Sequence, residues 1–126
     1  MPSHILIIDD DPDICKVKKA QLELNGAFTV TATNDPGTGL KLARSKNPDL
    51  ILLDIIMPEK DGFEVLQELK GDIHTAPIPV IMFTGVDEVE SRERAAELYN
   101  EEYVVKTADR ATLIAAINKV LARRPK

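Results

Sequence analysis

Five short apolar runs, separated by longer segments, constrain the fold of this chain more than any other feature. The runs are "ILII" (5–8), "FTVTA" (28–32), "LILL" (50–53), "VIMF" (80–83) and "YVV" (103–105). Strands that alternate with helices are joined by right-handed crossovers into a mostly parallel sheet. Most of the runs lack inside–outside alternation, as expected when helices cover both faces, whereas "FTVTA" alternates and suits an edge strand.

Three of the intervening segments have apolar residues at helical spacing. The segment 12–25 has the weakest stripe, because Gln21 interrupts it, and Gly26 is placed to end that helix. Asn34-Asp35-Pro36 predicts the start of another helix, since it offers an N-cap followed by a proline in the first turn. The three stripes are Ile14, Val17 and Leu24; Phe63, Leu66 and Leu69; and Leu113, Ile117, Val120 and Leu121.

Composition limits the class of protein. A length of 126 residues, 44% hydrophobic and 29% charged, is typical of one soluble globular domain. The net charge of -5 argues against a nucleic-acid surface, and no apolar run approaches the roughly 18 residues of a membrane span. Cys15 is the single cysteine, so no internal disulfide can form, and we expect a cytoplasmic protein.

Polar side chains follow four of the strand runs, at the edge where parallel sheets bind ligands. They are Asp9, Asp10 and Asp11 after the first run, Asp54 after the third, Thr84 after the fourth and Lys106 after the fifth. Clustered carboxylates either have raised pKa values or hold a cation, and Mg²⁺ prefers such oxygen ligands. A carboxylate can also attack phosphorus, with a metal, a hydroxyl and an ammonium around the transferred oxygens. This inventory predicts phosphoryl transfer to an aspartate.

The chain resembles the receiver domains of two-component response regulators over about residues 3–124. The resemblance rests on "ILIIDDDP", "DLILLDIIMPEKDGFEVL", "PVIMFTG" and "YVVK", in the order and at the separations of that family. It implies a flavodoxin-like, doubly wound α/β fold, with a five-stranded parallel sheet of order 2-1-3-4-5 between layers of five helices. We therefore expect residues 1–126 to form a single receiver domain.

The resemblance also implies the residues of the acceptor and metal site. Asp54 would be the phosphoacceptor. Asp10, Asp54 and the backbone carbonyl of Ile56 would bind Mg²⁺ or Mn²⁺ directly, while Asp9 would act largely through water. The phosphoryl group would come from a histidine kinase or a histidine phosphotransfer protein.

Further residues would hold the phosphoryl group and transmit its presence. Thr84 and Lys106 would bind its oxygens, and Thr84 and Tyr103 would form a switch pair whose side chains reorient on phosphorylation. A downstream protein or a second copy would then read the face formed by segment 87–100, the fifth strand and the last helix. The domain is expected to be a switch that assists its own phosphorylation, not an enzyme for outside substrates, and to bind neither nucleic acid nor membrane directly.

Two positions depart from the family pattern. Thr107 stands where the family usually has a proline in a cis peptide, and a cis bond before a non-proline residue costs about 3–4 kcal/mol. Either the local fold still enforces the cis bond or the loop after Lys106 takes another path. Asn100-Glu101 replaces the usual glycine-alanine, and we expect Asn100 to serve as a left-handed helix C-cap.

Several other residues have simple structural interpretations. Acids near helix starts are often N-caps, and a buried thiol without activating neighbours is a small core residue. On this basis Asp11 and Asp13 are assigned to capping, Asp61-Gly62 to a turn and helix start, Met57-Pro58 to the shape of the loop after Asp54, Cys15 to the core, and His4 and His74 to no site.

Other functions on this fold fit the residues less well. A flavodoxin-type protein would need phosphate donors after the first strand, but "DDDP" would repel a phosphate. An aspartate-based phosphatase would want a second acid two residues after its nucleophile, where this chain has Ile56. A degenerate receiver would have lost an acid or the lysine, and this chain keeps them all. The chain ends at Lys126, and it is expected to be either a stand-alone receiver or part of a longer regulator or hybrid kinase.

Ile56 and Val86 generate a prediction about the lifetime of the phosphoryl group. They lie two residues beyond Asp54 and Thr84, positions that flank the path of the attacking water in this family. Neither side chain can orient a water, so we expect slow intrinsic dephosphorylation, since a positioning interaction is typically worth a few kcal/mol and each ~1.4 kcal/mol is tenfold in rate. Ile56→Asn or Ile56→Glu should change the decay rate, measured with Mg²⁺ and no partner, without preventing phosphorylation. Loss of the phosphoryl group from the unaltered chain within seconds would contradict this role.

Overall fold

The structure is a computed structural model that describes residues 2–55, 57, 60–84, 102–105 and 108–123. Within these residues it contains strands, α-helices and one short 3₁₀ helix. The strands are β1 (Ser3–Ile8), β2 (Phe28–Thr33), β3 (Leu50–Asp54), β4 (Val80–Thr84) and β5 (Glu102–Val105). The helices are α1 (Pro12–Glu23), η1 (Leu24–Gly26), α2 (Pro36–Lys46), α3 (Gly62–Gly71) and α5 (Arg110–Arg123).

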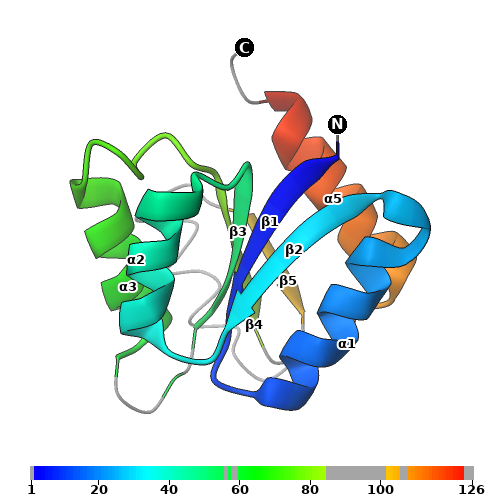
Figure 1. Ribbon diagram of the computed structural model, residues 1–126, viewed down its shortest axis with the longest axis horizontal. Helices are drawn as coiled ribbons and strands as arrows, with labels where there is room; N and C mark the ends of the chain where they lie inside the picture. The colour runs from blue at the N-terminus through cyan, green and yellow to red at the C-terminus, as the bar shows by residue number, and fades with distance from the viewer. Residues whose placement is uncertain (1, 56, 58–59, 85–101, 106–107, 124–126) are drawn as a thin grey trace.

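All five strands pair in one parallel sheet of order β2-β1-β3-β4-β5, which is the expected order (Figure 1). β2 is an edge strand, as its alternating sequence predicts, and its first three residues are buried, exposed and buried. Four of the five expected helices lie among the described residues. The segment 87–100, where the remaining one is expected, falls outside them.

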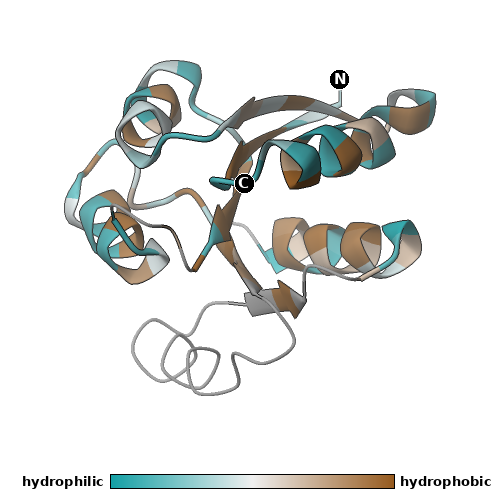
Figure 2. Ribbon diagram, turned by 90° about the horizontal axis from the view of Figure 1, so that it is seen from below, coloured by the Kyte–Doolittle hydropathy of each residue, from teal (hydrophilic) through white to brown (hydrophobic). Residues whose placement is uncertain are grey.

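Two apolar layers form, one on each face of the sheet, because successive strand residues point to opposite faces. Leu6, Ile8, Ile51 and Leu53 pack on the side of α2 and α3. Ile5, Ile7, Leu50 and Leu52 pack on the side of α1 and α5. Figure 2 shows the apolar faces of the helices turned toward the sheet between them. The unbroken apolar runs of β1 and β3 thus follow from burial on both faces.

Aspartates cap the start of all four described α-helices, including Asp109 before α5, whose carboxylate accepts from the N–H of Thr112. Asp11 accepts from the N–H groups of Asp13 and Ile14, Asp35 from that of Thr38, and Asp61 from that of Glu64. Each carboxylate satisfies a donor that the first helical turn leaves unpaired. The capping role expected of Asp11 and the helix starts expected at Asn34-Asp35-Pro36 and at Asp61-Gly62 are confirmed. Asp13 lies in the first turn of α1 and is not its N-cap.

The buried face of α1 differs from the expected stripe of Ile14, Val17 and Leu24. Val17 and Leu24 are each 51% exposed, and the buried residues are Cys15, Lys18 and Leu22. Ile14 is partly buried against this layer, so the stripe was wrong for Val17 and Leu24. Hydropathy excludes a lysine from the core, although its long apolar stem can be buried. The helix ends at Glu23 and continues as η1, where Asn25 and Gly26 have positive φ angles of 59° and 70°. The stripe expected for 62–70 is confirmed. In the last helix Leu113, Ile117 and Val120 are buried as expected, and Leu121 is partly buried against the same layer.

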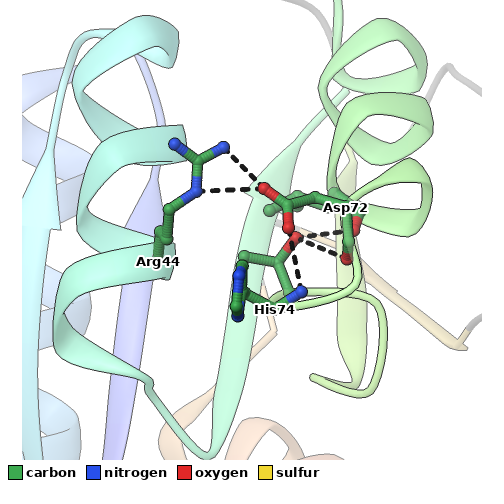
Figure 3. A network of polar contacts seen from close by, with 5 residues as sticks. Arg44, Asp72 and His74 are labelled. Atoms are coloured by element: carbon green, nitrogen blue, oxygen red, sulfur yellow. Dashed lines mark hydrogen bonds and ion pairs between the residues drawn. The ribbon is translucent and has the colours of Figure 1, made fainter.

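A polar network joins α2 to the segment after α3 (Figure 3). Arg44 Nε and Nη2 donate to one oxygen of Asp72 at 3.0 and 2.5 Å. The other oxygen accepts from the backbone N–H of His74 at 2.8 Å. This N–H first, and then Arg44, hold the pKa of Asp72 below its usual value. His74 thus contributes its backbone, and His4, whose ring nitrogen lies 2.8 Å from the Thr31 hydroxyl, also has a structural contact.

Among the described residues, no helix combines the length and the apolar character that crossing a membrane requires.

Gly62, the first residue of α3, has no room for a side chain. A Cβ atom there would lie 2.3 Å from the carbonyl oxygen of Asp54 and 2.7 Å from Cα of Ile55, and these backbone atoms cannot turn aside as a side chain would. We therefore predict that Gly62→Ala lowers the free energy of unfolding by about 2–3 kcal/mol, measured by chemical denaturation. Gly71→Ala in the same helix is the matched control, because nothing lies within 4 Å of its added methyl group. The control should be neutral or stabilising by up to about 1 kcal/mol, and equal effects of the two changes would contradict the contact.

Candidate functional site

Strand register brings the candidate residues to one edge of the sheet. Ile8 pairs with Leu53, so Asp9 follows β1 at the level where Asp54 ends β3. Asp54 itself pairs with Phe83, the residue before Thr84. Because the carboxyl ends of parallel strands share one edge, the register alone places these polar residues together.

Three carboxylates meet at this edge. Asp9, Asp10 and Asp54 each present an oxygen, and these oxygens all lie within 4.8 Å of one another. Asp9 is fully buried and Asp54 is 1% exposed, whereas Asp10 is partly exposed. Like charges held this close repel, so the cluster favours either a proton or a bound cation.

The backbone around Asp9 is fixed by several hydrogen bonds. Its N–H donates to the carbonyl of Thr33 at 3.2 Å, and its Oδ1 accepts from the N–H of Asp11 at 2.9 Å. Its own carbonyl accepts from the side-chain amide of Asn34 at 3.0 Å. These contacts orient Asp9 toward the cluster before any ligand binds.

Cys15 lies directly behind Asp9. Its Sγ is 3.5 Å from the Asp9 carbonyl oxygen, and the Asn34 amide donates to it at 3.4 Å. Burial, followed by the negative charges of Asp9 and Asp11, raises the pKa of Cys15 to about 11. The thiol therefore stays protonated at neutral pH, and its burial confirms its assignment to the core.

The backbone after Asp54 is tied to α3 and β4. The N–H of Gly62 donates to the carbonyl of Ile55 at 2.6 Å, and the N–H of Ile55 donates to the carbonyl of Phe83 at 3.3 Å. Met57 is buried in the core next to α3, in agreement with a structural role for this loop. The hydrogen bonds of Ile55 therefore tie the end of β3 to both α3 and β4.

The family model for the response regulator receiver domain matches residues 5–118 of this chain. The chain belongs to this family. As a receiver domain it is a component of two-component phosphorelay signalling, and such domains act as switches and are not enzymes for outside substrates.

This receiver domain covers almost the whole length of one relative but only about half the length of two others. It is 38% identical over 120 residues to "Protein PilH" of Pseudomonas aeruginosa, covering 95% of this chain and 98% of that protein. It is also 38% identical to "Probable transcriptional regulator ycf27" of Guillardia theta, over 97% of this chain but only 46% of that protein. The "DNA-binding dual master transcriptional regulator RpaA" of Synechocystis is 37% identical, again over 95% of this chain and 49% of the relative. The chain thus spans about half the length of the two transcriptional regulators.

Solved structures agree with the fold. A CheY-like receiver domain protein from Methanospirillum hungatei superposes with a TM-score of 0.86 at 27% identity, covering 98% of this chain and 97% of that one. A response regulator from Chloroflexus aurantiacus gives 0.89 at 21% identity, with 98% and 100% covered, and at that identity it supports the fold alone.

Not every predicted site residue can be placed. Asp9, Asp10 and Asp54 come together as predicted. Thr84 ends β4 and Tyr103 lies in β5, but only their backbones are described. Ile56, Val86 and Lys106, together with Thr107 and Asn100, lie outside the described residues, and their roles stay predictions.

Three residues near the site were missed from the sequence. Asn34 was assigned only to a helix start, yet its side chain contacts both Asp9 and Cys15. Gly62 was assigned only to a turn and helix start, yet it also packs against the carbonyl of Asp54. Lys18 was not considered at all, although it is buried. A polar residue at a core position is the signal that could have identified Lys18.

The donor set of the cluster fits a small divalent cation. Mg²⁺ binds oxygens at about 2.0–2.1 Å, so opposite ligands lie roughly 4 Å apart. The three carboxylate oxygens lie within 4.8 Å of one another, which is close enough for one cation to bind among them. Asp10, which is partly exposed, leaves the cluster open to water on one side.

Charge repulsion in the cluster predicts a gain in stability when one charge is removed. In the presence of a chelator, Asp54→Asn should raise the free energy of unfolding by about 1–2 kcal/mol, because it keeps the shape of the side chain and relieves repulsion by Asp9 and Asp10. Added Mg²⁺ should reduce the difference in free energy of unfolding between Asp54→Asn and the unaltered protein, since Mg²⁺ stabilises the unaltered protein by binding to it. The control Asp13→Asn removes an exposed acid from the first turn of α1 and should cost a few tenths of a kcal/mol. Destabilisation by Asp54→Asn in chelator would contradict repulsion as the dominant effect.

Proposed function

We propose that this receiver domain accepts a phosphoryl group on Asp54 from a histidine kinase or a histidine phosphotransfer protein. The observation that carries this proposal is the gathering of the Asp9, Asp10 and Asp54 carboxylates at the carboxyl edge of the sheet. An oxygen of Asp54 attacks phosphorus, the bond between phosphorus and the donor imidazole nitrogen breaks, and its electron pair leaves with that nitrogen. The position of Asp54 is fixed for this step, because the next residue, Ile55, is hydrogen-bonded to Gly62 of α3 and to Phe83 of β4.

Asp10, Asp54 and the Ile56 carbonyl would hold Mg²⁺ or Mn²⁺, with Asp9 acting largely through water. A bound dication neutralises charge on the carboxylates and on the phosphoryl oxygens. The partial exposure of Asp10 supports a direct metal role, because Mg²⁺ keeps several waters in protein sites. Thr84 and Lys106 would bind the remaining phosphoryl oxygens. The pairing of Thr84 with Val105, the residue before Lys106, supports this arrangement.

Phosphorylation would bias a two-state switch. The phosphoryl group would draw Thr84 inward and open space for Tyr103. The two residues belong to neighbouring strands: Phe83, which precedes Thr84, pairs with Val104, which follows Tyr103. The face formed by segment 87–100, β5 and α5 would then change and be read by a downstream protein or a second copy. The DNA-binding named for one relative belongs to that longer protein, and the acidic charge of this chain favours a protein partner.

Two points concern the whole chain. Residues 1–126 would form one receiver domain with a core of about 3–124, which the span of the elements from Ser3 to Arg123 supports. A cytoplasmic location is supported by the single free cysteine, because unpaired thiols are usual in reducing compartments.

Labelling with a small phosphodonor and Mg²⁺ tests the acceptor. Intact mass spectrometry should show one added phosphoryl group on the unaltered domain and none on Asp54→Asn. Asp13→Asn, a nearby acid outside the cluster, should be labelled normally. Asp10→Ala should weaken Mg²⁺ binding at least about tenfold, since it removes one of few protein ligands. Full, acid-stable labelling of Asp54→Asn would exclude Asp54 as the acceptor.

The same samples test the switch. Backbone amide NMR signals of β5 should shift when a phosphoryl mimic and Mg²⁺ are added to the unaltered domain, and they should not shift in Asp54→Asn. Unchanged β5 signals in a fully loaded domain would count against the coupling.

A further inference from the structure

Lys18 is a charged residue inside the apolar core. It lies on α1 between Cys15 and Leu22, the other buried residues of that helix, and is only 4% exposed. Burying an ammonium group costs free energy unless the charge is hydrogen-bonded or paired. Desolvation accordingly lowers the pKa of Lys18, although the nearby Asp109 carboxylate opposes that shift. The structure buries this charge despite the cost, in the apolar layer next to the proposed phosphorylation site.

The contacts of Lys18 connect three elements. Its Nζ donates a hydrogen bond of 3.0 Å to the carbonyl of Ala108, 90 positions away in the sequence. The same Nζ lies 5.8 Å from the ring centroid of Phe83, within the range of a cation–π contact. Phe83 pairs with Asp54 and directly precedes Thr84. One ammonium on α1 therefore contacts both the strand of the proposed switch threonine and the segment after β5.

That segment contains Lys106. On one side it is bounded by Val105, which pairs with Thr84 in the sheet. On the other side, after Ala108, the Asp109 carboxylate accepts from the Thr112 N–H at 2.8 Å and begins α5. Only Lys106 and Thr107 lie between the strand and Ala108. Thr107 is not a proline, so this short connection has no ring to restrict its backbone.

We propose that Lys18 is a positioning residue for phosphoryl transfer, which holds the Ala108 carbonyl and thereby fixes the segment that presents Lys106 to Asp54. The inference rests on the proposed role of Lys106. Lys18 acts at a distance from phosphorus and does not touch the transferred group. Its ammonium sets one of the two boundaries of the segment 105–108, and the sheet sets the other.

The simpler interpretation is that Lys18 only stabilises the packing of α1 against α5. Arg110 provides a comparison, because it also joins these helices: its Nε donates to the carbonyl of Gln21 at 2.8 Å and its Nη2 to that of Leu24 at 3.5 Å. These contacts lie at the end of α1, and they do not involve Ala108. A purely structural role would make the loss of Lys18 and the loss of Arg110 equivalent.

The test measures the rate of phosphorylation by a small phosphodonor in Lys18→Met, Arg110→Gln, Lys106→Ala and the double variant Lys18→Met/Lys106→Ala. Methionine keeps an unbranched stem of similar size and removes only the charge and donors. Lys18→Met should slow phosphorylation about tenfold, with Mg²⁺ affinity within about twofold of the unaltered domain. Arg110→Gln should change the rate less than about twofold. Adding Lys18→Met to Lys106→Ala should cause no further loss, because Lys18 acts through Lys106.

Each other outcome overturns the inference in a recognisable way. If Lys18→Met slows phosphorylation by the same factor in the unaltered domain and in Lys106→Ala, its effect is a general structural one. The same conclusion holds if Arg110→Gln slows phosphorylation as much as Lys18→Met does. A normal rate in Lys18→Met, while Lys106→Ala is slow, would overturn this inference alone. A normal rate in Lys106→Ala would overturn the proposed role of Lys106 and this inference with it. If Lys18→Met does not fold, Lys18→Leu, which also suits a buried position, takes its place in the same comparison.

Discussion

The parallel pairing of β1 with β3 is the constraint on which the site depends. Because Ile8 lies beside Leu53, the residues that follow β1 meet the last residue of β3. A shift of the pairing by one residue would move every side chain of β1 to the other face of the sheet and separate Asp9 from Asp54. The two apolar layers prevent this shift, since each strand contributes residues to both of them. The packing of the core thus holds the carboxylates together although they repel one another.

The surroundings of the cluster show how a strained arrangement of charge is supported. Asp9 is held by backbone contacts from β2 and α1 and by the Asn34 amide. On the other side, α3 begins with a glycine so close to Asp54 that no side chain fits between them. Rigid backbone on both sides leaves the carboxylates little freedom to move apart. Such preorganisation is what a site needs if it is to bind a cation or stabilise a transferred group.

α1 contributes more than a cover for the sheet. Its first residues follow the acidic pair, and Cys15 packs against the Asp9 carbonyl. One turn later, Lys18 reaches the residue before α5, and still later the carbonyls of Gln21 and Leu24 accept from Arg110. α1 therefore contacts the Asp9 carbonyl near its start, Ala108 in its middle and Arg110 near its end. The positioning role that we propose for Lys18 would account for a lysine at a position that packing alone would fill with an apolar residue.

The sequence by itself determined the strands, the parallel sheet, the helix starts and the acidic residues at the strand ends. Apolar runs and capping aspartates are local signals, which a reader of the chain can recognise without knowing the neighbours. The tertiary structure alone decided which face of α1 is buried, that the Asn34 amide contacts the Asp9 carbonyl, and that Gly62 must remain a glycine. These features depend on contacts between residues far apart in the chain, such as the hydrogen bond from Lys18 to the Ala108 carbonyl. Hydropathy assigns every lysine to the surface, because it takes no account of a distant carbonyl that can accept a hydrogen bond from a buried ammonium.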